Sequence, residues 1–126
     1  MNEKKKKIMV MEDDIFVMDI YKTKLSEEGY EVIAAENGME ALIKVNEENI
    51  KPDLIMLDIL MPYMDGLSFL KEVRKKEEFK TTPVILLTNL SQKEEIQQGF
   101  ELGAQDFIIK SHFTPSEVME KIKQFL

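Results

Sequence analysis

Carboxylates follow two of the apolar runs in this sequence. Glu12 and Asp13 come after residues 8–11 (IMVM), and Asp58 comes after residues 54–57 (LIML). Continuous apolar runs of this length are typical of strands covered on both faces of a parallel sheet. The carboxyl ends of such strands meet at one edge, where open α/β sheets bind their ligands. Acids gathered there repel one another and any anion, so the pattern predicts a site for a hard divalent cation.

Two other reactive side chains follow later apolar runs in the same way. Thr88 comes after residues 84–87, and Lys110 comes after residues 107–109. We expect both to reach the edge that carries the acids. Such a set suits phosphoryl transfer, because a carboxylate can attack phosphorus while Mg²⁺, lysine and threonine neutralise or bind the phosphoryl oxygens.

The elements that must position these residues alternate along the chain. We predict strands at residues 8–11, 32–35, 54–57, 84–87 and 107–109, with an amphipathic helical pattern after each. Strand followed by helix, repeated with short links, predicts a doubly wound α/β fold with a five-stranded parallel sheet, the (βα)5 flavodoxin-like arrangement. We find no linker or repeat, so residues 1–126 are expected to form one domain.

Several helix boundaries have local signals. Asp14 is expected to cap the first helix and not to bind a metal, and Gly29 to end that helix. Residues 91–94 (SQKE) form a capping-box pattern for the fourth helix, which Gly103 ends. Residues 114–117 (TPSE) form another for the fifth, with proline at the first helical position.

Composition excludes several classes of protein. The chain has 17 basic and 24 acidic residues, a net charge of −7 and no cysteine. A surface this acidic argues against nucleic acid or an anionic membrane as a direct partner. The lysines at residues 4–7 precede only four apolar residues, too few for a signal peptide. We therefore expect a cytoplasmic protein without disulfides.

Over essentially its whole length the sequence resembles the receiver domain of two-component response regulators. The residues that carry the resemblance are the pair Glu12 and Asp13, the segment 58–66 (DILMPYMDG), Thr88, Phe107 and Lys110. Any one of these residues alone is weak evidence for the family. Together, in this order and at the spacing of alternating strands and helices, they are specific to it. The resemblance implies a flavodoxin-like receiver fold and a chemotaxis-type single-domain regulator.

The resemblance also implies a role for each acid. Asp58 would be the phospho-acceptor. Asp13, Asp58 and the backbone carbonyl of Leu60 would bind Mg²⁺, and Glu12 would reach the ion through water. Lys110 would contact the phosphoryl group.

A conformational switch and a phosphoryl lifetime are implied as well. Thr88 would turn inward to bind the phosphoryl group, and Phe107 would follow it from an exposed to a buried position. Leu60 and Leu90 lie two residues after the phospho-acceptor and two after the switch threonine. In receivers these positions flank the route of the attacking water, and leucine cannot orient a water, so we expect a long-lived aspartyl phosphate.

The implied function is a signalling switch and not an enzyme. A sensor histidine kinase or a histidine phosphotransfer protein would donate the phosphoryl group. An output protein that the sequence does not identify would read the surface formed by the fourth helix, fifth strand and fifth helix. We expect a stand-alone regulator, because no effector domain follows the last helix, and a monomer or a phosphorylation-dependent dimer.

Two departures and three rival interpretations stay open. Ser111 replaces the proline, often preceded by a cis peptide, that usually follows the lysine, and Asn89 replaces the usual small residue after the threonine. A flavodoxin-type binding module would need a phosphate loop where the first acids lie. A haloacid-dehalogenase-type phosphatase would need an aspartate at Leu60. A degenerate receiver acting only as a protein-interaction module is the third alternative.

Overall fold

One parallel sheet forms the centre of the molecule. The computed structural model describes residues 5–89 and 92–126. Its strands pair in the order β2-β1-β3-β4-β5, all parallel. They are β1 (Lys7–Met11), β2 (Glu31–Ala35), β3 (Leu54–Asp58), β4 (Val84–Thr88) and β5 (Asp106–Ile109). This is the flavodoxin-like order, so the predicted fold class is confirmed.

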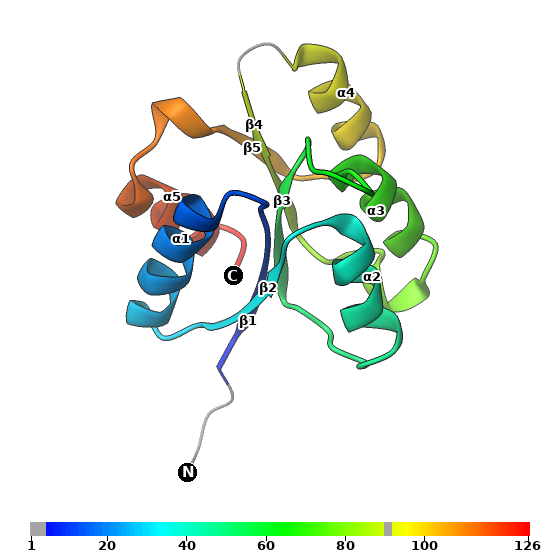
Figure 1. The fold of residues 1–126 in the computed structure, drawn as a ribbon, viewed down its shortest axis with the longest axis horizontal. Coiled ribbons are helices and arrows are strands. Elements are labelled where there is room, and N and C mark those ends of the chain that lie inside the picture. Colours follow the sequence, from blue (N-terminus) through cyan, green and yellow to red (C-terminus); the bar gives the residue numbers. More distant parts are fainter. Residues whose placement is uncertain (1–4, 90–91) are drawn as a thin grey trace.

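Helices cover both faces of the sheet, with α1 and α5 on one side and α2, α3 and α4 on the other (Figure 1). The α-helices are α1 (Ile15–Glu27), α2 (Gly38–Asn46), α3 (Gly66–Val73), α4 (Lys93–Glu101) and α5 (Pro115–Lys123). Two short 3-10 helices, η1 (Glu77–Phe79) and η2 (Lys110–His112), lie in the connections. No helix within residues 5–89 and 92–126 is long and apolar enough to cross a membrane.

The predicted helix boundaries agree with the structure at most positions. The Asp14 Oδ1 atom accepts hydrogen bonds from the backbone N–H groups of Phe16 and Val17, at 2.9 and 3.2 Å. Thr114 and Glu117 form the expected capping box at α5. The fourth helix differs, because α4 begins at Lys93. The predicted cap of that helix, Ser91, lies outside the described residues.

The sheet sends alternate side chains into two apolar cores. In β3, Leu54 and Met56 pack on the side of α1 and α5. Asp58 continues that alternation at the end of the strand. In β4, Val84 and Leu86 pack on the side of α2, α3 and α4, and Thr88 continues that row. Asp58 and Thr88 therefore belong to opposite faces of the sheet, although both lie at its carboxyl edge.

One arginine connects α3 with the far end of α4. The guanidinium group of Arg74 donates to the backbone carbonyls of Leu102 at 3.1 Å, Gly103 at 2.9 Å and Thr82 at 2.9 Å, and also to that of Phe79. A planar group with several donors suits this role, since one side chain can satisfy carbonyls from separate segments. The C-terminal end of α4 is thereby fixed to the body of the domain.

Candidate functional site

Asp58 and Lys110 meet at the carboxyl edge of the sheet, as the sequence predicts. Asp58 is 5% exposed. Its Oδ2 atom accepts a hydrogen bond from Lys110 Nζ at 2.7 Å, and its Oδ1 atom accepts one from the backbone N–H of Leu60 at 3.2 Å. The peptide bond between Lys110 and Ser111 is trans. Serine in the place of proline therefore still allows the lysine to reach the acid.

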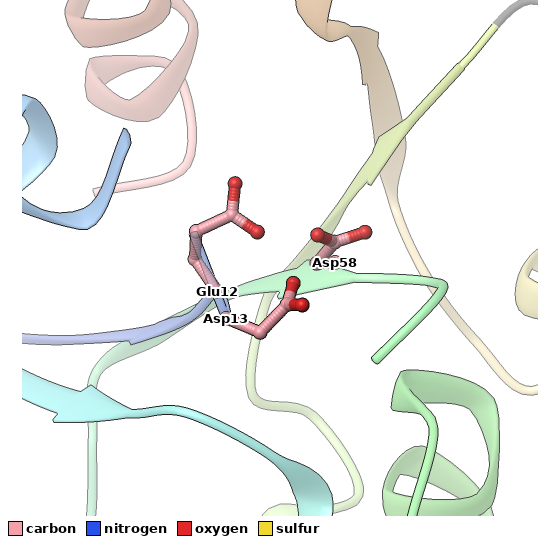
Figure 2. A group of neighbouring side chains, drawn as sticks. All are labelled: Glu12, Asp13 and Asp58. Carbon is pink, nitrogen blue, oxygen red and sulfur yellow. The ribbon is translucent and has the colours of Figure 1, made fainter. Parts of the chain in front are cut away.

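Glu12, Asp13 and Asp58 form one acidic cluster. One carboxylate oxygen from each lies within 4.8 Å of the others. Figure 2 shows the three carboxylates gathered between the ends of β1 and β3. Glu12 is buried, whereas Asp13 faces solvent, so the cluster has one closed side and one open side.

Lys110 also pairs with Glu12, a contact that the sequence analysis did not predict. Lys110 Nζ donates to Glu12 Oε1 at 2.7 Å and so bridges the two buried acids. The ammonium group compensates part of their charge. It leaves Glu12 Oε2 buried with no hydrogen-bond partner among the described residues.

Burial controls the protonation of this group. Burial, together with the hydrogen bond and charge of Asp58, raises the pKa of the Glu12 carboxyl to about 8, and Lys110 opposes that rise. Burial also disfavours the charge of Lys110. Its hydrogen bonds to Asp58 and Glu12 outweigh burial, so the pKa of Lys110 is raised. The raised pKa of Glu12 means that, without a cation, burial opposes the ionised form of this carboxyl.

The acidic cluster fits a magnesium ion. Mg²⁺ binds oxygens at about 2.0–2.1 Å, so ligands on opposite sides of the ion are about 4 Å apart. Carboxylate oxygens within 4.8 Å need only a small contraction or a bridging water. The buried Glu12 Oε2, which lacks a partner among the described residues, offers the lone pairs that such a shell would use.

The segment after Asp58 holds the acid in place. The backbone N–H of Gly66 donates to the carbonyl of Ile59 at 3.1 Å. A Cβ atom at Gly66 would collide with the backbone carbonyl of Asp58. The glycine of the 58–66 motif therefore does more than form a turn, because only glycine lets α3 begin against the end of β3.

Thr88 ends β4 as predicted, but its hydroxyl bonds toward the start of α4. The residue is 1% exposed. Its Oγ1 atom donates to Gln92 Oε1 at 2.8 Å, and the backbone N–H of Asn89 donates to the same oxygen at 2.8 Å. Gln92 was not among the predicted site residues, because the capping-box pattern of residues 91–94 assigned the cap to Ser91. A polar residue four positions after a strand-end threonine was the only available signal.

The remaining predicted residues are less closely tied to the acids. Phe107 is half-buried, and its ring meets that of Phe100 edge-on, with 6.0 Å between centroids. Its predicted movement stays a prediction. Leu60 is 57% exposed beside Asp58, while Leu90 lies outside the described residues. The predicted metal contact of the Leu60 carbonyl and the gating role of both leucines also stay predictions.

Comparison with known proteins gives one consistent result. A family model described as "Response regulator receiver domain" matches residues 8–123. A probable transcriptional regulator ycf27 of Cyanophora paradoxa is 40% identical over 97% of this chain and 48% of its own length. The transcriptional regulatory protein ResD of Bacillus subtilis is 39% identical over 95% of this chain and 48% of its own length. The chain thus spans about half the length of these curated relatives.

Solved structures show the same fold. The chemotaxis response regulator CheY4 of Vibrio cholerae superposes with a TM-score of 0.87 at 32% identity. The match covers 98% of this chain and 100% of that one. The likeness therefore includes the entire sheet and the helices on both of its faces.

Proposed function

The chain belongs to the response-regulator receiver domain family, and we propose that it is a phosphorylation-activated switch of a two-component phosphorelay, with Asp58 as the phospho-acceptor. One observation carries the proposal. The Asp58 carboxylate lies at the end of β3 with Lys110 Nζ 2.7 Å from its Oδ2 atom and two further acids close by. This combination provides a nucleophile, a cation for phosphoryl oxygens and ligands for a metal.

The chemistry requires one displacement at phosphorus. An Asp58 oxygen attacks the phosphoryl group of a phosphohistidine, the new P–O bond forms, and the P–N bond breaks. The phosphohistidine ring must carry a proton on its other nitrogen, so that it leaves with the electron pair as a neutral imidazole. Mg²⁺ would be held by Asp13, Asp58 and the Leu60 carbonyl, with Glu12 reaching it through water, and would neutralise phosphoryl charge. Lys110, already at Asp58, is placed to bind a phosphoryl oxygen.

The product stays on the protein, which distinguishes this role from that of an enzyme. Each chain would accept one phosphoryl group, assist its transfer and later its hydrolysis, and not turn over a substrate. The charge and acceptor oxygens of the aspartyl phosphate would then attract Thr88. The rearrangement would reach an output protein through α4, β5 and α5.

The start of α1 suits a donor protein. Ile15 and Phe16 are 69% and 80% exposed and directly follow Asp14 beside the acidic cluster. Exposed apolar side chains of this size favour contact with a protein surface. We place the sensor histidine kinase or histidine phosphotransfer protein there, because its phosphohistidine must reach Asp58.

Family membership sets aside the flavodoxin-type and dehalogenase-type interpretations. The degenerate receiver, a module that binds proteins without accepting phosphate, is the remaining alternative. It shares the fold and differs only in chemistry, so a chemical experiment separates the two.

The test is intact mass spectrometry after incubation with acetyl phosphate and Mg²⁺. We expect the mass of one phosphoryl group on the wild type and none on Asp58→Asn. Asp14→Asn is the matched control, because Asn caps a helix as well as Asp does and Asp14 lies outside the cluster. Normal labelling of Asp58→Asn would overturn the assignment, and an unlabelled wild type would favour the degenerate receiver.

A further inference from the structure

Gln92 is a buried polar residue that the proposed chemistry does not use. It lies at the start of α4 and is only 4% exposed. Its side chain does not cap the helix. Instead its Oε1 atom accepts from the Thr88 hydroxyl and from the backbone N–H of Asn89, both at 2.8 Å. A buried polar atom needs such partners, and the contact supplies them for Gln92 Oε1, whereas Gln92 Nε2 is buried without a hydrogen-bond partner among the described residues.

The direction of these hydrogen bonds follows from which atoms carry protons. The backbone N–H of Asn89 can only donate, so the Gln92 atom that faces it must be the carbonyl oxygen. That oxygen can only accept, so the Thr88 hydroxyl must point its proton at Gln92. The other acceptor near Thr88 Oγ1 is the Asn89 carbonyl, at 3.1 Å. The hydrogen bonds from Thr88 Oγ1 to Gln92 Oε1 and to the Asn89 carbonyl thus both use the single hydroxyl proton of Thr88.

A phosphoryl group on Asp58 would need that proton too. Ionised phosphoryl oxygens are acceptors, and a threonine hydroxyl has a single proton to give. The Thr88 side chain also lies on the opposite face of the sheet from Asp58. It must therefore rotate toward Asp58 before it can bind the phosphoryl group. The hydroxyl cannot stay bonded to Gln92 and also bind the phosphoryl group.

We propose that Gln92 is a positioning residue that holds Thr88 in the resting state by competing with the phosphoryl group for its proton. This inference rests on the proposed function of Asp58 and Thr88. The strength of one neutral hydrogen bond then sets how readily phosphorylation activates the domain.

The same residue connects the threonine to α4. The Gln92 carbonyl accepts the hydrogen bond of the Ile96 N–H at 3.0 Å, in the first turn of the helix. When Thr88 leaves, the Gln92 side chain loses this hydrogen bond. Gln92 is also the residue that directly precedes α4, so the change occurs at the start of the helix. Asn89 is bonded to Gln92 twice, because its N–H donates to the Gln92 side chain and its carbonyl accepts from the Gln92 backbone N–H.

The test measures beryllofluoride binding, in the presence of Mg²⁺, by NMR titration of backbone amides. Gln92→Met keeps the length of the side chain and removes the acceptor, so we expect about three- to tenfold tighter binding, the value of one neutral hydrogen bond. Gln92→Glu provides a charged acceptor and should bind beryllofluoride more weakly. Gln97→Met, an exposed change on the same helix, is the matched control and should leave the affinity unchanged.

The proposed role of Gln92 depends on the Thr88 hydroxyl, so a second experiment removes that hydroxyl. In a Thr88→Ala background, Gln92→Met should no longer tighten binding, because no hydroxyl remains to be released. An equal gain in both backgrounds, or no gain in the wild-type background, would overturn the inference about Gln92 alone. A wild-type protein that binds no beryllofluoride would instead overturn the proposed function, and this inference with it.

Discussion

The two halves of the candidate site are held together by different kinds of interaction. On one side, Lys110 joins Glu12 and Asp58 through charged contacts of 2.7 Å. On the other side, Thr88, Asn89 and Gln92 are joined only by hydrogen bonds between neutral groups. Charge-assisted bonds are roughly twice as strong as neutral ones. We therefore expect the charged half to keep its geometry and the neutral half to change when Asp58 is phosphorylated.

Removing a ligand from the charged half should have the largest effect. Asp13 supplies the open side of the cluster, and without its carboxylate two acids remain. We expect Asp13→Ala to weaken Mg²⁺ binding by about a hundredfold or more, beyond the loss typical of a residue that only supports a ligand. Isothermal titration calorimetry gives the affinity. Asp14→Asn should bind Mg²⁺ normally, and an equal loss in that variant would show that local charge matters and coordination does not.

Magnesium binding should also depend on pH through Glu12. Its pKa is raised to about 8, and a bound cation close by, reached through water, would favour the ionised carboxylate and so release that proton. Below that pKa the affinity should rise by about tenfold per pH unit, and it should level off above pH 8. Calorimetry in buffers of different ionisation enthalpy would detect the released proton. Glu12→Gln should remove the pH dependence, and if the slope persists another group supplies the proton.

The same shift predicts how the metal-free protein responds to pH. A carboxyl whose pKa is higher in the folded state than its usual 4.5 favours folding only while it is protonated. The free energy of unfolding should therefore fall as the pH rises from about 4.5 to about 8, and Mg²⁺ should counteract the loss. Urea denaturation at several pH values measures this. A stability that rises across that window in the wild type, but not in Glu12→Gln, would contradict the assignment.

The lifetime of the aspartyl phosphate should depend on Leu60 and Leu90. Leu60 is exposed next to Asp58 and offers no polar group to an attacking water. The double change Leu60→Asn, Leu90→Glu should speed phosphate loss by about tenfold, because orientation contributes strongly to such reactions. Loss can be followed by intact mass. Equal rates in the wild type and the double mutant would rule out the gate.

Breaking the neutral half should have the mildest effect on chemistry. Thr88→Ala should still accept phosphate on Asp58, because the charged half is intact. Its affinity for beryllofluoride should fall only severalfold, the value of one hydrogen bond. The amide shifts that spread along α4, β5 and α5 in the wild type should nevertheless be largely lost. Full propagation in Thr88→Ala would show that the two halves are not coupled through this residue.

The sequence predicted what depends on the regular geometry of a parallel sheet. Two buried strands end in Asp58 and Thr88 and a third ends just before Lys110, so the parallel sheet must bring these residues to one edge, and it does. It did not predict contacts that depend on the path of a side chain. Lys110 was expected at a phosphoryl group, and in the structure it also bridges to Glu12. The role of Gln92 depends on its side-chain contacts with Thr88 and Asn89, and no periodic pattern encodes those contacts.

Arg74 gives the domain a fixed axis for any motion of α4. Its guanidinium holds the carbonyls of Leu102 and Gly103, just after the end of the helix. In the last turn of the helix, a Cβ atom at Gly99 would collide with the Leu86 side chain, so the helix packs closely against the sheet there. At the starting end, the Gln92 side chain accepts hydrogen bonds from Thr88 and Asn89, and the Gln92 backbone N–H donates to the Asn89 carbonyl. Because Arg74 holds the far end of α4, we expect any motion of this helix to be largest at its starting end, beside Thr88.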